Sequence, residues 1–318
     1  MQNQIPKNWQ KDNLENLLDI LIDHRGITPK KLGGDWLTSG IPALSAKNIK
    51  TGKIVNEQDI RFVSQKLYEK WMPEKLEDGD ILLTSEAPLG ELFFLKEKKD
   101  YVLSQRLFAL RTNKKKLNSR YLYYYLQGSI GRQELLRRLS GTAAEGIRQA
   151  ELRKINVIFP EDILEQEKVA SVISAFDDKI EVNNKIAKTL EEMAQTLFRE
   201  WFIEFKFQGY KKIKFVDSEF GKIPEEWTIL KFEEYARLEY GKALQEEKRV
   251  TGNILVYGSS GQVGTHTEKL CEGPGIVVGR KGNVGSVFWI SDDFYPIDTT
   301  FYISTKNSLY YIYFILKK

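Results

Sequence analysis

The residues of this chain best suited to recognition chemistry are two pairs in which a side-chain amide stands next to a guanidinium, Gln105-Arg106 and Arg148-Gln149. A glutamine can hydrogen-bond adenine through two atoms at once, and an arginine can do the same with guanine. Gly141 and Gly146 precede the second pair and give its backbone conformational freedom. These pairs therefore favour hydrogen bonding to base edges, although each residue taken singly is equally compatible with a solvated turn.

Further candidates for contacts with bases or phosphates lie in short polar segments between apolar runs. In the first half of the chain they are Lys30, Lys31, Ser45, Lys47, Asn48, Thr84, Ser85 and Thr142. In the second half they are Ser259, Ser260, Arg280, Lys281, Thr299 and Thr300. Additional candidate phosphate contacts are Lys50, Lys53, Lys114, Lys115 and Lys116, of which the last three fit an exposed turn equally well.

Groups for stand-alone catalysis or metal binding are scarce. Cys271 is the single cysteine, and His24 and His266 are the only histidines, which argues against a disulfide framework and a metal cluster. The glycine-rich segment 279–285 lacks the Lys-Ser/Thr ending of a phosphate-binding loop, and a segment of similar pattern at 85–90 favours a repeated turn instead. An Asn-Pro-Pro-Tyr tetrapeptide of the methyltransferase kind is also missing. We expect a non-enzymatic chain without a metal or cofactor of its own.

The formal net charge of +4 is unevenly distributed. Residues 1–160 carry 27 Lys and Arg against 19 Asp and Glu, whereas residues 161–210 carry 6 against 11. The basic first part suggests a polyanionic partner, although a modest positive charge is common among small cytoplasmic domains. The sequence shows neither an apolar run of about 20 residues nor the apolar core of a signal peptide, so a cytoplasmic protein is expected.

Short apolar runs bounded by glycine, proline or charged residues predict strands at 81–84, 91–95, 107–111 and 154–159. Segments 121–127 and 131–139 are predicted to be helical, the first with Ser119 as its N-cap. The tyrosines at 121 and 123–125 are expected to pack in the core rather than to stack on single-stranded bases. The expected fold class is therefore α/β, more closely mixed α+β, with a curved and partly antiparallel sheet.

The chain also contains an internal repeat. Ile5-Pro6-Lys7-Asn8-Trp9 recurs as Ile223-Pro224-Glu225-Glu226-Trp227, and four later segments recur in the same order, ending with 119–126 matched to 308–315. The repeat indicates two units of one architecture, and the second unit is expected to be incomplete.

The longest predicted element is a helix from Glu161 to about Phe207, because no glycine or proline occurs between Pro160 and Gly209. Apolar residues recur along it at alternating three- and four-residue steps, which is the seam of a coiled coil. The seam consists of Ile173, Phe176, Ile180, Asn183, Ala187, Leu190, Ala194, Leu197 and Trp201. One small domain cannot bury so long a stripe, so we expect it to be exposed or covered by a partner helix.

Three motifs around the start of this helix carry a resemblance. They are a strand ending in proline (155–160), a Glu-Gln doublet near the helix start (164–170) and an aspartate before x-Ile (177–180). Segments 40–44, 79–82 and 141–147 add to them. With the repeat and the long helix, these motifs make the chain similar along its whole length to the specificity subunit of type I restriction–modification systems.

The resemblance implies two tandem target recognition domains, residues 1–160 and 209–318, joined by a coiled-coil-type spacer helix, residues 161–208. Each domain would read one half of a split target in double-stranded DNA. The helix would dock two modification subunits that carry S-adenosylmethionine and methylate adenine. A restriction and motor subunit, which uses ATP and magnesium, would complete the complex.

By the same resemblance, the chain would be truncated within the second recognition domain, before a second long helix could begin. Two copies would then self-associate through their single long helices. The alternative interpretation is a coiled-coil scaffold or interaction protein without DNA readout. A salt-dependent interaction with duplex DNA would distinguish the two.

Overall fold

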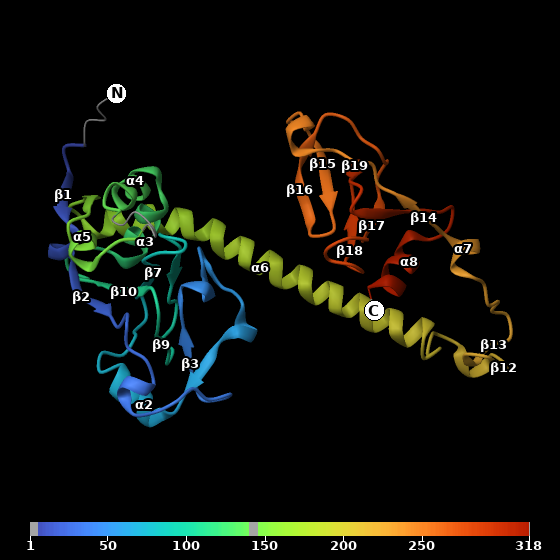
Figure 1. Cartoon of the computed structure of the whole chain (residues 1–318), viewed down its shortest axis with the longest axis horizontal. Coiled ribbons are helices and arrows are strands. Elements are labelled where there is room, and N and C mark those ends of the chain that lie inside the picture. The colour runs from blue at the N-terminus through green and yellow to red at the C-terminus, as the bar shows by residue number, and fades with distance from the viewer. Residues whose placement is uncertain (1–5, 140–145, 318) are drawn as a thin grey trace. The chain divides into compact units, whose positions relative to one another are not determined.

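The structure is a computed structural model, and it describes residues 6–139 and 146–317. Contacts divide the chain into two compact units, Met1–Asn183 and Asn184–Lys318 (Figure 1). One helix, α6 (Ile163–Phe202), contributes its first half to unit 1 and its second half to unit 2. None of the described helices combines the length and the apolar character that crossing a membrane requires.

Unit 1 contains short strands and short helices before α6. The strands are β1 (Trp9–Asn13), β2 (Leu18–Asp23), β3 (Ile41–Leu44), β4 (Ile49–Lys50), β5 (Lys53–Ile54), β6 (Arg61–Val63), β7 (Ile81–Thr84), β8 (Leu92–Phe94), β9 (Val102–Leu103), β10 (Leu107–Thr112) and β11 (Asn156–Pro160). The helices are α1 (Leu14–Leu17), α2 (Gln65–Trp71), α3 (Ser119–Gln127), α4 (Ser129–Arg137) and α5 (Gln149–Arg153). The strands predicted at 81–84, 91–95, 107–111 and 154–159 are confirmed as β7, β8, β10 and β11, with ends that differ by one or two residues.

Two sheets form the body of unit 1. One is antiparallel with the order β2-β10-β7-β8, and in the other β3 lies between antiparallel β6 and parallel β9. Side chains of β10 alternate between two cores, as the two-residue period of a strand requires. Phe108 and Leu110 pack with α3 and α4, whereas Leu107 and Ala109 pack with α2 and β3. In Figure 1, α3 and α4 accordingly lie at one end of unit 1 and α2 at the other.

Unit 2 repeats this architecture. Its elements after α6 are β12 (Phe215–Ser218), β13 (Gly221–Pro224), α7 (Phe232–Tyr235), β14 (Arg237–Tyr240), β15 (Ile254–Gly258), β16 (Gly261–His266), β17 (Gly275–Gly279), β18 (Val287–Ile290), β19 (Phe294–Pro296), β20 (Thr300–Ser304) and α8 (Leu309–Leu316). The sheet β14-β20-β17-β18 matches β2-β10-β7-β8 in order and direction. The sheet β16-β15-β19 matches β6-β3-β9, with one antiparallel and one parallel pairing in each. The internal repeat is therefore confirmed at the level of strand topology.

The alignment of α3 with α8 shifts by one residue from the sequence prediction. Asn118, not Ser119, caps α3, because its side chain accepts a hydrogen bond from the backbone N–H of Tyr121 at 3.0 Å. Ser308 caps α8 in the same way, at 3.4 Å from the N–H of Tyr311. Asn118 thus corresponds to Ser308, and Ser119 is instead hydrogen-bonded to Thr112 at 2.9 Å. The prediction that the tyrosines at 121 and 123–125 pack in the core is confirmed: Tyr121 and Tyr123 are buried, and Tyr124 and Tyr125 are half-buried against the same core.

Helix α6 is shorter than the predicted span of 161 to about 207. It ends at Phe202, because Phe205 adopts a left-handed φ of 54° that a helix cannot continue through. The ring of Phe205 packs edge-on against Trp227 at 5.1 Å between centroids. Trp227 belongs to the repeated Ile-Pro-x-x-Trp segment, so tertiary packing overrides the helical propensity of residues 203–207.

The start of α6 is attached to unit 1 by a buried glutamine. Gln166 is fully buried, and its side-chain oxygen accepts a hydrogen bond from Asn118 N at 2.8 Å. Its side-chain nitrogen donates to the carbonyls of Lys116 and Pro160, at 3.1 and 2.8 Å. Because a buried amide that is fully satisfied has few alternative positions, Gln166 fixes the helix start against the turn between β10 and α3. The Glu-Gln doublet of the sequence thus has a structural explanation.

A buried ion pair ties the two central strands of unit 1 together. Asp80, just before β7, is fully buried, and it accepts hydrogen bonds from Nε and Nη2 of Arg111 in β10 at 2.9 and 2.8 Å. The Arg111 side chain is 13% exposed and also donates to the carbonyl of Lys75 at 2.6 Å. Both partners are therefore hydrogen-bonded as well as paired.

Replacing Asp80 with alanine would leave a buried guanidinium without its carboxylate. We expect the free energy of unfolding of unit 1 to fall by about 3–5 kcal/mol, as measured by urea denaturation followed by tryptophan fluorescence. Glu97→Ala is the matched control, because it removes the carboxylate of an exposed pair with Lys99. Equal losses in the two variants would contradict this role of the buried pair.

Candidate nucleic-acid interface

Four loops of unit 1 meet at one edge of its sheets and carry most of the predicted contact residues. The end of β7 lies beside the start of β10, and Ser85 N donates to the carbonyl of Arg106 at 2.9 Å. Ala46 N donates to the carbonyl of Gln105 at 3.1 Å, and Ile147 N donates to the carbonyl of Ser85 at 2.9 Å. These bonds join residues 45–48, 84–86, 104–106 and 146–149 into one surface region, which we call the loop edge.

Three predicted contact residues at the loop edge are buried, and this corrects the sequence-based assignment. Thr84 is fully buried, and its hydroxyl donates to the carbonyl of Pro88 at 2.6 Å and accepts from the N–H of Glu91 at 2.9 Å. Asn48 is 3% exposed and donates to two backbone carbonyls. Ser85 is 1% exposed, and its hydroxyl has no hydrogen-bond partner among the described residues. Thr84 and Asn48 therefore shape the turns instead of reaching a groove.

The exposed members of the loop edge are Lys47, Gln105, Arg106 and Arg148, while Ser45 and Gln149 are half-buried. Nε of Arg106 lies 3.0 Å from Oε1 of Glu86, so a cation and an anion face each other across the ends of β7 and β10. Thr142 lies outside the described residues. Both amide–guanidinium pairs of the sequence, 105–106 and 148–149, are thus brought to the same edge.

The other predicted lysines lie elsewhere. Lys30 and Lys31 form a short 3-10 helix, η1 (Lys30–Leu32), and both are exposed. Nζ of Lys31 donates to the carbonyl of Gly26 at 2.7 Å, and neither lysine is hydrogen-bonded to a described residue of the loop edge. Lys114 to Lys116 are an exposed turn after β10, at the opposite end of that strand from the loop edge. The structure therefore does not bring these lysines to the loop edge.

Arg25 is a residue of this edge that the sequence analysis missed. Its guanidinium pairs with Asp23 through Nε and Nη2, at 2.8 and 2.9 Å, and lies 3.9 Å above the ring of Phe108. Nη1 donates to the carbonyl of Ile147 at 3.3 Å, so Arg25 joins the end of β2 to the segment that carries Arg148. The sequence signal was an Asp-x-Arg directly after the apolar strand 18–22, which is a pattern too common to stand out.

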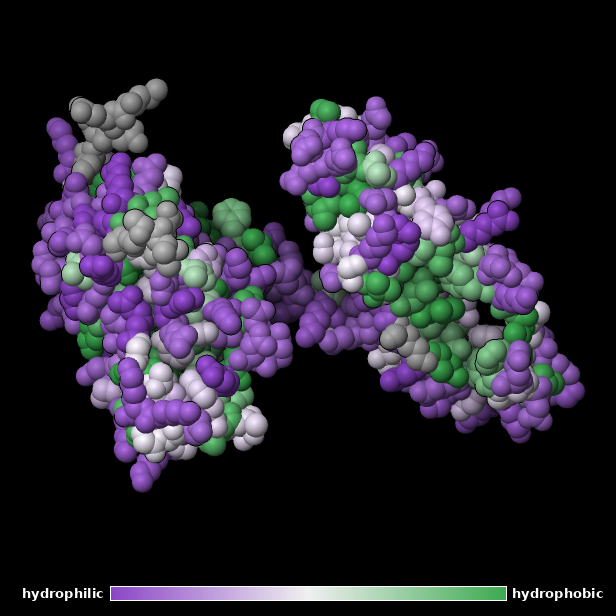
Figure 2. Space-filling model, in the orientation of Figure 1, coloured by the Kyte–Doolittle hydropathy of each residue, from purple (hydrophilic) through white to green (hydrophobic). Residues whose placement is uncertain are grey.

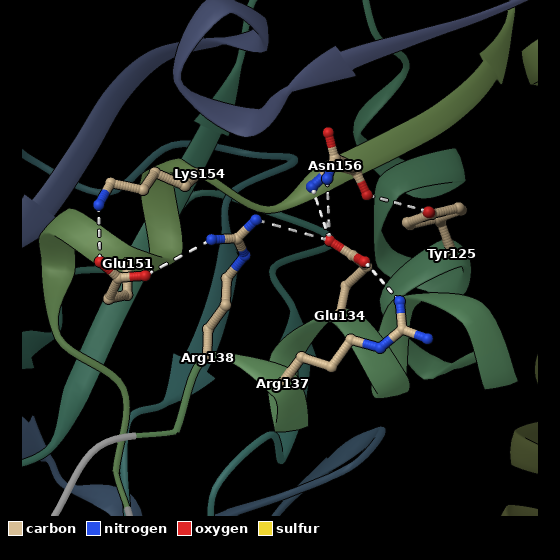
Figure 3. A network of polar contacts seen from close by, with 7 residues as sticks. All are labelled: Tyr125, Glu134, Arg137, Arg138, Glu151, Lys154 and Asn156. Atoms are coloured by element: carbon tan, nitrogen blue, oxygen red, sulfur yellow. Dashed lines mark hydrogen bonds and ion pairs between the residues drawn. The ribbon is translucent and has the colours of Figure 1, made fainter.

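A network around Glu134 joins α4, α5 and β11 (Figure 3). In that view the Glu134 carboxylate lies between Arg137, Arg138 and Asn156. It accepts hydrogen bonds from the backbone and side-chain nitrogens of Asn156 at 3.1 and 3.2 Å. Arg138 also pairs with Glu151 at 3.5 Å, which joins the end of α4 to α5. The first turn of α5, whose N-cap is Arg148, is therefore fixed to α4 and to β11.

Unit 2 places its predicted residues at the equivalent strand ends. Arg280 and Lys281 follow β17, and their backbone N–H groups both donate to the carbonyl of Thr299 before β20, at 2.9 and 3.0 Å. Ser259 and Ser260 form the turn between β15 and β16, where the carbonyl of Ser259 accepts from Ser286 Oγ at 2.6 Å. The region that these residues form is the loop edge of unit 2 (residues 259–260, 280–281 and 298–300).

Two residues of this second edge have structural roles. Thr300 is fully buried, with its hydroxyl donating to the carbonyl of Ile297 at 2.8 Å, which corrects its assignment as a contact residue. Arg280 is half-buried, donates Nε and Nη2 to the carbonyl of Asp298, and lies 5.1 Å from the ring of Tyr240. The glycine-rich segment 279–285 is the turn between β17 and β18, as the repeat predicted.

The predicted seam of α6 is exposed within each unit. In unit 1, Phe176 and Ile180 are 67% and 58% exposed, and in unit 2, Leu190 and Leu197 are 58% and 47% exposed. The remaining exposed members of the seam are Ile173, Asn183, Ala187 and Trp201. Figure 2 shows further apolar surface, in green, in unit 2 around α8 and the last turns of α6. An exposed apolar stripe of this kind marks a surface for a partner.

Among residues 6–139 and 146–317, no three His, Cys, Asp or Glu side chains lie together in a group that could hold a metal ion. The loop edges carry cations, amides and hydroxyls on turns that the sheets hold in place, together with one acidic residue each, Glu86 in unit 1 and Asp298 in unit 2. The cations, amides and hydroxyls can donate hydrogen bonds to phosphates and base edges.

Residues 6–192 match the family described as type I restriction modification DNA specificity domain. The type I restriction enzyme MjaIX specificity subunit of Methanocaldococcus jannaschii is 27% identical over 241 residues, covering 75% of this chain and 54% of that protein. The HindI specificity subunit of Haemophilus influenzae is 28% identical over 196 residues, covering 56% of this chain and 40% of that protein. The chain thus spans about half the length of the curated relatives it matches.

The fold is similar to the crystal structure of the type I restriction–modification system S subunit from M. genitalium. The two share a TM-score of 0.54 at 18% identity, and the match covers 100% of this chain and 78% of that one. The similarity confirms the expected mixed α+β fold, with two β-rich domains separated by a long helix.

The Glu134 network predicts a pH dependence of stability. Burial alone would raise the pKa of the Glu134 carboxyl, but the hydrogen bonds from Asn156 and the charges of Arg138 and Arg137 outweigh it and hold that pKa below its ordinary value. A carboxyl with a lowered pKa stabilises the folded state above its unfolded pKa of about 4.3, and this contribution is lost as the pH falls through the folded pKa.

We therefore expect Glu134→Gln to flatten the decline of the unfolding midpoint between about pH 6 and pH 3. Urea titrations at several pH values would measure it, with Glu167→Gln, an exposed carboxylate on α6, as the matched control. Identical pH profiles for the wild type and Glu134→Gln would show that the network does not stabilise the fold through this charge.

Proposed function

Because this chain belongs to the type I restriction modification DNA specificity family, we propose that it is the DNA recognition subunit of a type I restriction–modification complex. Residues 1–160 and 209–318 would be two target recognition domains, each reading half of a split target, and residues 161–208 would be the spacer between them. The observation that carries the proposal is the repetition of one polar loop edge at the same strand ends of both units.

The composition of the loop edges supports contact with duplex DNA. Gln105 and Arg106 have the hydrogen-bonding groups to read adenine and guanine, while Lys47 and Lys281 have the charge to contact phosphates. The surplus of basic residues in 1–160 would attract the polyanion over a longer range. Lys30 and Lys31, on η1, would add phosphate contacts away from the loop edge.

We assign the exposed seam of α6 to partner subunits. Ile173, Phe176, Ile180, Asn183, Leu190, Leu197 and Trp201 would dock two modification subunits. Those subunits would bring S-adenosylmethionine for adenine methylation, and a restriction and motor subunit would use ATP and magnesium, so no catalytic step is assigned to this chain. Because its substrate would be cellular DNA, the complex would act in the cytoplasm. A second copy of this chain is a further partner for the same seam.

A coiled-coil scaffold without DNA readout is the second candidate function, favoured by the length and exposure of the seam. A recognition subunit and a scaffold differ in the salt dependence of DNA binding, because a protein that neutralises phosphates loses DNA affinity steeply as the salt concentration rises. A complex with modification subunits that shows no salt-dependent binding to duplex DNA would favour the scaffold.

Arg106→Ala should weaken methylation of the target. Loss of a bidentate arginine–guanine contact corresponds to roughly 5- to 150-fold lower discrimination at one base pair. Mapping of adenine methylation in a host genome should show a split motif that depends on this chain and loses one specified base in the variant. Gln105→Ala tests the neighbouring position, and Lys98→Ala, an exposed lysine outside the loop edge, is the control. Unchanged specificity in both test variants would remove residues 105–106 from the interface.

Charged substitutions on the seam should prevent assembly. We expect Ile180→Asp with Leu190→Asp to lower the mass of the complex with modification subunits, and that of any dimer of this chain, as measured by light scattering. Lys179→Asp, one residue from Ile180 and off the seam, should leave both masses unchanged. Normal assembly of the double variant would exclude the seam as the docking surface.

A further inference from the structure

Glu86 is the one acidic residue among the residues of the loop edge of unit 1. It directly follows Thr84 and Ser85 at the end of β7, and it faces Arg106 across the gap to β10, with Oε1 3.0 Å from Nε. Its side chain is 33% exposed and that of Arg106 is 49% exposed, so the pair lies at the surface. A carboxylate beside a proposed DNA contact repels phosphates. The position of Glu86 next to Arg106 therefore requires an explanation.

The backbone of Arg106 is held in an uncommon conformation. Its φ of 65° lies in the left-handed region, which is strained for a residue with a side chain and persists only where the surroundings fix it. Those surroundings are present on both sides, since the carbonyl of Arg106 accepts from Ser85 N and the carbonyl of Gln105 accepts from Ala46 N. The base of the arginine side chain is therefore fixed by two neighbouring loops.

Glu86 is fixed from its other side. It forms an antiparallel bridge with Gly146, which packs so closely that an added Cβ there would lie 3.0 Å from Glu86 Cβ and 3.1 Å from the carbonyl oxygen of Ser85. The ion pair with Glu86 is the one side-chain interaction of Arg106 with a described residue. The ion pair is made through Nε, so N–H donors of the Nη1 and Nη2 groups remain for a base.

We propose that Glu86 is a specificity-determining residue: by its ion pair it holds the guanidinium of Arg106 in one orientation toward a guanine, and it thereby sets the base chosen at one position of the target. The inference rests on the proposed function and deepens it. A guanidinium held in advance loses less conformational freedom on binding, and a guanidinium that cannot turn away discriminates more sharply between bases.

Unit 2 supports the inference, because an arginine is also held between its equivalent strand ends. In unit 1 the arginine precedes β10 and its partner follows β7, whereas in unit 2 this order is reversed. There the arginine, Arg280, follows β17, and its partner is the carbonyl of Asp298 before β20, at 2.6 Å from Nη2. Rings of Tyr240 and Phe301 lie 5.1 and 5.8 Å from that guanidinium. In both units an arginine at the end of a central strand is thus held by a partner across the sheet, by a carboxylate for Arg106 and by a backbone carbonyl with aromatic rings for Arg280.

The test uses the full chain assembled with modification subunits and a duplex library randomised over the half-site, with methylation of each sequence as the readout. Arg106→Ala and Glu86→Ala should lose discrimination at the same single position, by roughly fivefold or more. Glu86→Ala should keep or increase total DNA affinity, because it removes a negative charge near phosphates. The double variant should match Arg106→Ala, and Glu86→Gln, which keeps a hydrogen-bond acceptor, should fall between Glu86→Ala and the wild type.

Three outcomes would overturn the inference. Lost discrimination at a different position in Glu86→Ala would mean that the carboxylate reads its own base, such as the amino group of a cytosine. Unchanged discrimination in Glu86→Ala beside an altered Arg106→Ala would mean that the ion pair does not orient the arginine. An equal fall in affinity for all sequences, with a lower unfolding temperature, would mean a purely structural role.

The same experiment shows separately whether the proposed function fails, because the wild-type complex would then methylate the library without any base preference. Lys47→Ala is the matched control at the same edge, since Lys47 is exposed and forms no ion pair with a described residue. As a phosphate contact it should lower affinity uniformly across sequences and reduce the salt slope by about 1.

Discussion

Burial of the central strands on both faces is the constraint on which the rest of unit 1 depends. Strand β7 is fully buried, and alternate residues of β10 enter two separate cores, one under α3 and α4 and one under α2 and β3. A slip of one residue would exchange the two sets of side chains, so the register of these strands is strongly fixed. Because the strand ends are fixed, so are the loops that join them. The buried pair of Asp80 and Arg111 adds directional bonds to the same two strands.

Much of this fold was accessible from the sequence, because it depends on patterns of apolar residues. Short apolar runs bounded by glycine, proline or charge located β7, β8 and β10, the three- and four-residue steps located α6, and the recurrence of Ile-Pro-x-x-Trp located the second unit. The residue-level assignments were less reliable. Asn118 and Ser119 are both good N-caps, and only the geometry shows which of them accepts the hydrogen bond. The end of α6 depends on Phe205 packing against Trp227, a contact across 22 residues that local propensity does not contain.

The candidate interface was predicted in outline and corrected in detail for a similar reason. A threonine or asparagine in a turn can face solvent or bond the turn itself, and the sequence does not separate these cases. Thr84, Asn48 and Thr300 proved to bond the protein's own backbone. Conversely, Arg25 and Glu86 act through partners distant in sequence, namely the carbonyl of Ile147 and the guanidinium of Arg106. Side chains whose role is defined by a tertiary partner carry little local signal.

The attachments of α6 and the loop edge of unit 1 lie at opposite ends of the same strands. Asn118, which binds Gln166, follows the end of β10, and Lys96, which pairs with Asp178 and Glu181 of α6, follows the end of β8. Residues 84–86 and 104–106 lie at the far ends of β7 and β10. Substitutions in the loops therefore need not disturb how the helix is held. Such a separation makes the unit evolvable: the residues of its loops can change while the scaffold and the attachment of α6 are inherited intact.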